Sequence, residues 1–127
     1  MILVRITSIN NQLIKDTTKL HQKKYRDKTG LFLVEGYHLY EEALKSTNIE
    51  TVFTTDDSIK GDNVVEVTQQ VLEKLSQTKT PQPVLTVCKK IDNRELTDKI
   101  LILEEVQDPG NLGTIIRSSV AFNVDTI

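Results

Sequence analysis

The sequence predicts an α/β protein with a mainly parallel sheet, and it predicts that one domain ends near residue 96 and a second begins there. Short apolar segments alternate with segments of helical periodicity, the order that generates parallel sheets covered by helices on both faces. The charged, apolar-poor segment IDNRELTDK separates residues 1–96 from 97–127. With 127 residues, 38% hydrophobic and 27% charged, the chain has the composition of an ordinary soluble globular protein.

The composition excludes several classes of protein. No apolar run approaches the roughly 20 residues that cross a bilayer, and the N-terminus lacks the apolar stretch of a signal peptide, so we expect a cytoplasmic location without a membrane partner. Cys88 is the only cysteine, which excludes an internal disulfide and a cysteine-cluster zinc site. Its segment PVLTVC favours a small buried strand residue over a reactive thiol. The sequence predicts no metal site.

The N-terminal arm, residues 1–30, is basic. It carries seven Lys and Arg against two acids, whereas the remainder carries nine against sixteen. Nothing breaks a helix from Asn10 to Asp27, and Gly30 is a plausible stop. On such a helix four cations form one exposed ridge with few acidic partners, which indicates phosphate contact, although a solvated helix face is the plain alternative. The predicted RNA contacts are Lys15, Lys19, Lys23, Lys24, Arg26, Lys28 and, at the end of the next strand, Glu35.

The remaining elements of the first domain follow from their periodicity and punctuation. The near-continuous apolar run LFLVEG suits a strand buried on both faces. Thr68 is a probable N-cap, and Pro81 and Pro83 force an extended entry into the last strand. In order, we expect strands over residues 31–36, 49–55, 63–67 and 83–90, and helices over residues 37–46 and 69–77.

The second domain restarts the pattern after residue 96. KILILEEV (99–106) predicts a strand, DPGN a turn, and LGTIIRSSVAF a helix, after which VDTI begins another strand. One strand, one helix and the start of a strand cannot bury a core alone, so we expect the first βαβ piece of a larger domain. The core stripe of the helix would comprise Leu112, Ile115, Ile116, Ser119 and Val120.

The turn before this helix predicts a small electropositive recess. Pro109 and Gly110 suit a type II turn, Asn111 is placed near the N-cap, and Gly113 leaves space over which the guanidinium of Arg117 can fold back. Free backbone N–H groups, an amide and a planar cation suit a phosphate or a sugar oxygen. A plain cap and a solvated arginine are the alternative. The glycine spacing matches neither a dinucleotide fingerprint nor a P-loop, which disfavours dehydrogenase or ATPase chemistry.

The stretch VQDPGNLGTIIRSSVAF (106–122) resembles the first signature of the SpoU/TrmH family of RNA ribose methyltransferases. Residues 6–44 and the segment TPQPVLTV resemble the substrate-binding domain that precedes the catalytic domain in many members. Two separated motifs agree in order and spacing, and the resemblance covers nearly the whole chain. Asn123 stands where glycine is usual, and asparagine tolerates a left-handed helix end nearly as well.

The resemblance implies a fold and a function. Residues 1–96 would form an α/β/α sandwich like that of RNA-binding ribosomal proteins, and residues 97–127 the start of a knotted, Rossmann-like methyltransferase domain. The family transfers a methyl group from S-adenosylmethionine to a ribose 2'-hydroxyl of rRNA or tRNA, with the motif's Asn and Arg in the active site. These correspond to Asn111 and Arg117, with Gly110 and Gly113 in the active-site turn.

The family's cofactor pocket and much of its homodimer interface lie in a C-terminal knot that these 127 residues lack. We therefore expect a fragment that is inactive alone. Arg117 would act as the base or as an electrostatic anchor, and its high pKa favours the anchor. Two alternatives remain: a non-catalytic RNA-binding module, and a regulatory domain that binds a small anion.

Overall fold

The computed structural model describes residues 4–46 and 48–127. It divides into two compact units, Met1–Ile91 and Asp92–Ile127. The boundary between the two units lies in the charged segment, after residue 91. The sequence predicts this boundary near residue 96. The roles assigned to the two domains stay predictions. No helix of the described residues is long and apolar enough to cross a membrane.

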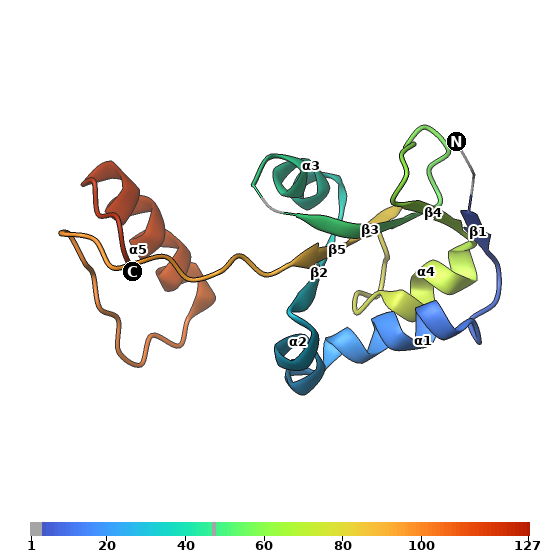
Figure 1. The fold of residues 1–127 in the computed structure, drawn as a ribbon, viewed down its shortest axis with the longest axis horizontal. Helices are drawn as coiled ribbons and strands as arrows, with labels where there is room; N and C mark the ends of the chain where they lie inside the picture. Colours follow the sequence, from blue (N-terminus) through green and yellow to red (C-terminus); the bar gives the residue numbers. More distant parts are fainter. Residues whose placement is uncertain (1–3, 47) are drawn as a thin grey trace. The chain divides into compact units, whose positions relative to one another are not determined.

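A five-stranded sheet is the centre of the unit Met1–Ile91, in the order β1-β4-β3-β5-β2 (Figure 1). β1 runs parallel to β4 and β4 to β3, whereas β5 is antiparallel to both β3 and β2. The strands are β1 (Val4–Ile6), β2 (Leu31–Glu35), β3 (Ile49–Thr54), β4 (Val64–Val67) and β5 (Val84–Lys89).

The expectation of a mainly parallel sheet holds for the pairings among β1, β4 and β3, but it is wrong for β5, which is antiparallel to both of its neighbours. Val84 pairs with Thr54 at the far end of β3, so the connection 76–83 returns the chain to the end of the sheet where β3 finishes. β5 therefore starts at that end of the sheet and runs antiparallel to β3. A strand forms at Leu31–Glu35 as predicted, but its expected burial on both faces is wrong, because β2 lies at the sheet edge and its side chains are only half-buried.

Helices cover both faces of this sheet, α1 and α4 on one face and α3 on the other (Figure 1). The predicted helix limits hold closely for α3 and α4, and the Thr68 hydroxyl caps α4 by accepting from the N–H of Val71. The helices are α1 (Gln12–Thr18), the 3-10 turn η1 (Lys19–His21), α2 (Lys23–Thr29), α3 (Tyr37–Ser46) and α4 (Gln69–Leu75).

The larger core lies between the sheet and the layer that contains α1 and α4. Phe53 from β3 and Leu75 from α4 are fully enclosed, and Ile14 joins them from α1. A smaller cluster around Val52 lies on the α3 face. Cys88 is fully buried on β5, as its segment predicted, and burial raises the pKa of its thiol.

The unit Asp92–Ile127 contains one helix, α5 (Pro109–Ala121). The predicted strand over 99–106 is wrong, since that segment contributes only a single parallel bridge, from Ile100 to Thr126. The predicted core stripe of the helix is also largely uncovered: Ser119 is buried, but Val120 is 70% exposed. Among the described residues no partner strand lies beside residues 99–106, so periodicity alone did not produce a strand there. Asn123 is left-handed with φ 58°, as expected.

Candidate functional site

The basic arm is bent into α1, η1 and α2. The predicted continuous helix from Asn10 to Asp27 is wrong, because Gln22 is extended with φ −99° and ψ 132°. Arg26 turns back at this break and donates from one guanidinium nitrogen to the carbonyl oxygens of Leu20 (3.0 Å) and His21 (2.9 Å). Nε2 of His21 in turn donates to the Leu75 carbonyl oxygen at the end of α4, at 2.6 Å.

These contacts correct the prediction of one ridge formed by Lys15, Lys19, Lys23 and Arg26. The half-buried Arg26 satisfies helix-end carbonyls that would otherwise lack partners. The ridge positions, divided by the bend, belong to separate short helical segments. Periodicity could not reveal the bend, since no proline or glycine marks it.

Two acids of the arm form ion pairs that the predicted ridge did not include. Asp16 lies 3.7 Å from Nζ of Lys19. Asp27 accepts from Nζ of Lys23 at 2.6 Å and from Nζ of Lys90 at 3.0 Å. Hydrogen bonds from Lys23 and then Lys90 lower the pKa of Asp27 to about 2. All these groups are exposed, so the lysines remain accessible to a polyanion and the pairs add little stability.

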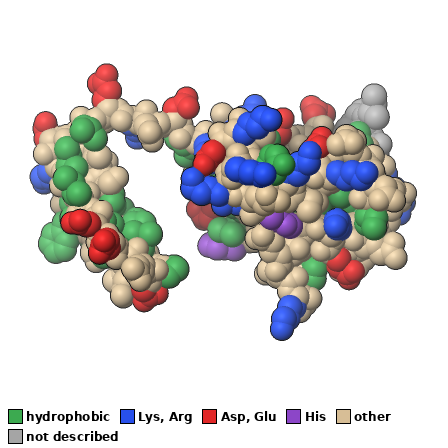
Figure 2. Space-filling view, turned by 90° about the horizontal axis from the view of Figure 1, so that it is seen from below, with side chains coloured by type: hydrophobic (Ala, Val, Ile, Leu, Met, Phe, Trp, Pro, Cys, Tyr) green, Lys and Arg blue, Asp and Glu red, His purple; other side chains and the backbone are tan. Residues whose placement is uncertain are grey.

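An aromatic ring lies among the arm's cations. Nζ of Lys24 is 5.0 Å and Nζ of Lys19 is 5.6 Å from the centroid of the Tyr25 ring. The ring is half-buried and packs against the core. Figure 2 views the molecule from the side on which α1 and α2 lie, and Lys and Arg side chains gather on this face. The exposed cations of the arm are Arg5, Lys15, Lys19, Lys23, Lys24 and Lys28.

Glu35 connects the end of β2 to the loop after α4. Its carboxylate accepts from the Ser76 hydroxyl at 2.9 Å and from the N–H of Gln77 at 3.0 Å. Gly36 follows with φ 96°, and a Cβ there would overlap the Gln82 side chain. Glu35 thus positions a loop, and its role as an RNA contact stays a prediction.

The turn before α5 differs from the sequence prediction. Asp108, not Asn111, is the N-cap, and its carboxylate accepts from the N–H of Gly110 at 3.0 Å. The helix begins at Pro109, a residue well suited to the first helical position, so Gly110 is helical and has no positive φ. The predicted anion recess is therefore not formed here, because a carboxylate already occupies the positive end of the helix.

Asn111, Gly113 and Arg117 all lie exposed on α5. No heavy atom outside the helix's own nearby backbone lies within 4 Å of a Cβ built at Gly113. The predicted folding of Arg117 across Gly113 into contact is thus wrong for this conformation. With about 100° per residue, Asn111 and Arg117 are about 120° apart around the helix axis. Their assignment as catalytic residues depends on the motif and not on this geometry.

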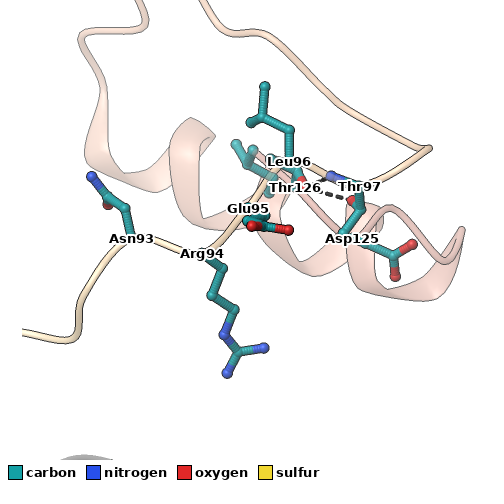
Figure 3. A pocket seen from close by; sticks show the side chains of 8 residues that line it. Asn93, Arg94, Glu95, Leu96, Thr97, Asp125 and Thr126 are labelled. Atoms are coloured by element: carbon teal, nitrogen blue, oxygen red, sulfur yellow. Dashed lines mark hydrogen bonds between the residues drawn. The ribbon is translucent and has the colours of Figure 1, made fainter.

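A cavity of about 680 Å³ lies in the unit Asp92–Ile127 (Figure 3). The segment 93–97 and the segment 125–127 line it, and the N–H and hydroxyl of Thr97 contact the Thr126 hydroxyl. Arg94 points away from this pair in the view. Neither Asn111 nor Arg117 lines the cavity. Among the described residues no group of three or more His, Cys, Asp or Glu could hold a metal ion.

Comparison with known proteins assigns the class. Residues 11–86 match the family model described as the MRM3-like substrate binding domain. The Bacillus subtilis protein "23S rRNA (guanosine(2553)-2'-O)-methyltransferase RlmP" is 39% identical over 131 residues, covering 97% of this chain and 53% of that protein. Human mitochondrial rRNA methyltransferase 3 is 29% identical over 122 residues, covering 80% of this chain and 29% of that protein.

Solved structures agree with the sequence relatives. An rRNA methyltransferase from Sinorhizobium meliloti has a TM-score of 0.72 and 31% identity over 94% of this chain and 51% of that one. An AdoMet-bound rRNA methyltransferase from Sinorhizobium meliloti has a TM-score of 0.74 and 29% identity over 98% of this chain and 56% of that one. A TrmH-family RNA methyltransferase from Porphyromonas gingivalis has a TM-score of 0.75 and 31% identity over 92% of this chain and 50% of that one.

The basic face, the sheet and these likenesses define a protein built on the substrate-binding domain of an RNA methyltransferase. The chain belongs to the SpoU/TrmH family of RNA methyltransferases. The resemblance found in the sequence is therefore confirmed. The chain spans about half the length of the Bacillus subtilis relative and of these three solved structures.

Proposed function

We propose that this chain takes part in S-adenosylmethionine-dependent methylation of a ribose 2'-hydroxyl in RNA, rRNA above all. The carrying observation is that similarity to the Bacillus subtilis 2'-O-methyltransferase extends over 97% of the chain and so includes both units. The unit Met1–Ile91 docks the RNA through the basic arm, and α5 supplies the first catalytic motif.

Two residues of α5 are assigned to the reaction by the family motif. S-adenosylmethionine supplies an electrophilic methyl group when bound to the whole enzyme. Attack by a ribose oxygen needs a fixed nucleophile and stabilisation of the charge that develops as its proton leaves. Arg117, permanently cationic and planar, anchors the neighbouring phosphate and stabilises that oxygen, and Asn111 orients the ribose by hydrogen bonds. In the whole enzyme, Arg117→Lys keeps the charge but loses the fork, so full activity would refute the bidentate role.

We propose that S-adenosylmethionine binding requires residues that are not part of this 127-residue chain. The exposed apolar residues Ile102, Val120 and Phe122 support the proposal that further chain packs on this unit. Isothermal titration of the 127-residue chain with S-adenosylmethionine should show no tight binding, and a micromolar dissociation constant would contradict this.

RNA docking is tested through the arm. The double variant Lys15→Glu/Lys24→Glu should weaken binding of a structured rRNA hairpin and flatten the dependence of affinity on salt, by roughly one unit of log–log slope for each phosphate that the arm no longer neutralises. Lys45→Glu/Lys60→Glu, at exposed sites outside the arm, is the control with the same change of net charge. Equally weakened binding in both proteins would indicate a non-specific charge effect and count against docking by the arm.

A non-catalytic RNA-binding module is the second candidate. It is favoured by the family model, whose match covers only the substrate-binding domain at residues 11–86. The two candidates separate in a methyl-transfer assay on the longest natural form of the protein: transfer abolished by Asn111→Ala supports the enzyme, and RNA binding without any transfer supports the module. The small-anion domain loses its support, because Asp108 occupies the helix end on which it depended.

A further inference from the structure

A second cavity, of about 160 Å³, opens in the unit Met1–Ile91 between the basic arm and the sheet. One wall comes from α1 and η1 with Leu13 and Leu20, and the other from β2 and β5 with Leu31 and Val87. Leu20 and Val87 are buried and form the floor, whereas Leu13 is 42% exposed at the mouth. We call this feature the arm cavity.

The size and lining of the arm cavity suit one flat ring. A protein cavity of roughly 150 Å³ lined by aliphatic side chains holds a benzene molecule. The arm cavity is of this size and open on one side, so a ring can enter while its substituents stay outside. The lining combines four aliphatic side chains with Thr17, Thr29, Thr51 and two carboxylates. A mainly apolar slot of these dimensions can take the faces of a nucleobase but not a hydrated phosphate.

Two carboxylates, Asp16 and Glu50, lie at the edge of the arm cavity. Their ion pairs and hydrogen bonds within the described part of the chain use one oxygen each, Oδ1 of Asp16 with Lys19 and Gln12, and Oε2 of Glu50 with Lys89. The second oxygens, Oδ2 and Oε1, are left as acceptors. Within the described lining there is no Lys or Arg, so the cavity repels phosphate and accepts hydrogen-bond donors.

The surroundings of the arm cavity have the opposite charge. Its helical wall belongs to residues 1–30, which carry seven cations against two acids. An RNA held by its phosphates on these exposed lysines has its unpaired bases within reach of the apolar slot, and sequence-specific RNA recognition operates on such splayed-out bases. The charge pattern therefore places phosphates on the lysines and a base in the cavity.

We propose that the arm cavity binds one unpaired nucleobase of the docked RNA, and that it prefers guanine. The Watson–Crick edge of guanine presents two adjacent donors, N1–H and the 2-amino group, to the acceptor oxygens that Asp16 and Glu50 have left. Uracil offers a single donor between two carbonyl oxygens, which the acids at the cavity edge repel. The site depends on the proposed RNA docking, and it adds base selection to a face otherwise selective only for charge.

The first test uses methyl NMR of the full 127-residue chain titrated with guanosine 5'-monophosphate. The methyl signals of Leu13, Leu20, Leu31 and Val87 should shift, and uridine 5'-monophosphate at the same concentration should shift them several-fold less. Equal shifts with both nucleotides would overturn the guanine preference. Shifts with benzene but with neither nucleotide would show an apolar cavity only, and would overturn the site.

The second test compares hairpin RNAs whose loop carries guanosine, inosine or uridine at one unpaired position. Wild-type protein should bind guanosine RNA roughly tenfold more tightly than uridine RNA, the usual value of one good base contact, with inosine between them. Asp16→Asn/Glu50→Gln should remove this discrimination. The matched control Asp62→Asn/Glu41→Gln, at exposed sites outside the cavity lining, should keep it. Discrimination unchanged in the first variant would refute the site.

The two proposals fail in distinguishable ways. Failure of RNA docking appears as unchanged affinity for every hairpin in Lys15→Glu/Lys24→Glu. Failure of the base site appears as arm-dependent affinity without discrimination between guanosine and uridine. Circular dichroism of the carboxylate variants should match wild type, because both acids are exposed and lie outside the core.

Discussion

The two units bury their apolar residues to very different extents. In Met1–Ile91 the sheet and helices enclose Phe53 completely, whereas Phe122 in Asp92–Ile127 is 77% exposed. The first unit has two core clusters, while α5 buries only Ser119. The difference indicates that the free energy of folding comes chiefly from the first unit, and that the apolar side chains of the second remain available for further contacts.

The largest expected effect tests this contrast with two phenylalanines. Phe53→Ala should lower the free energy of unfolding by about 3–5 kcal/mol, because it removes a fully buried ring and leaves a cavity. Phe122→Ala should change it by less than about 0.5 kcal/mol. Urea denaturation of both variants measures the difference, and similar losses of stability would show that the second unit is folded through Phe122 as tightly as the first.

Two arginines give the next contrast. Arg26→Gln should cost about 1.5–3 kcal/mol, the usual value of hydrogen bonds to a charged donor, because it frees the carbonyls of Leu20 and His21 at the bend. Arg117→Gln should leave the stability of this chain unchanged, since the side chain is exposed. Thermal unfolding followed by circular dichroism measures both. If Arg26→Gln is as stable as the wild type but binds RNA more weakly, this result would support the direct RNA contact of Arg26 predicted from the sequence.

The helix caps are expected to have smaller effects. Thr68→Ala removes the acceptor for the N–H of Val71 and should cost about 1 kcal/mol in global stability. Asp108→Ala should leave global stability nearly unchanged and speed amide exchange in the first turn of α5. Hydrogen exchange by NMR distinguishes the two. Reduced global stability in Asp108→Ala would show instead that α5 unfolds cooperatively with the unit Met1–Ile91.

The smallest expected effect is the dependence of stability on pH at Asp27. Its pKa is lowered to about 2, so its ion pairs contribute above the ordinary value of 3.8 and are lost as pH falls through 2. Asp27→Asn should flatten the pH dependence of stability only between these values. A carboxyl titration by NMR checks the pKa, and a midpoint near 3.8 in the wild type would mean that Lys23 and Lys90 do not hold the carboxylate in solution.

Most of the local structure could be predicted from the sequence, because it depends on residues close together. The strands at Ile49–Thr54 and Val64–Val67 show as short segments rich in β-branched residues, and the helix Tyr37–Ser46 shows as a 3.6-residue period. Burial of Cys88 followed from its apolar neighbours. β1 was missed because a three-residue strand is too short to show a period.

The candidate site was predictable in its residue types and not in its geometry. The excess of positive charge on residues 1–30 is a property of composition, and it predicted the face that we propose for RNA docking. The bend at Gln22 was not foreseen, because the groups that hold it, Arg26 with Leu20 and His21 with Leu75, come from separate elements. The arm cavity was equally invisible, since its walls are far apart in the sequence.

The sequence by itself determined the family, the alternation of strands and helices, and the basic character of the arm, since each depends on residue identity or on short-range periodicity. Only the tertiary structure decided the reversed direction of β5, the bend of the arm and the choice of Asp108 as helix cap. Pairing direction and caps depend on which distant or competing partner satisfies a backbone group, and a one-dimensional pattern does not contain that choice.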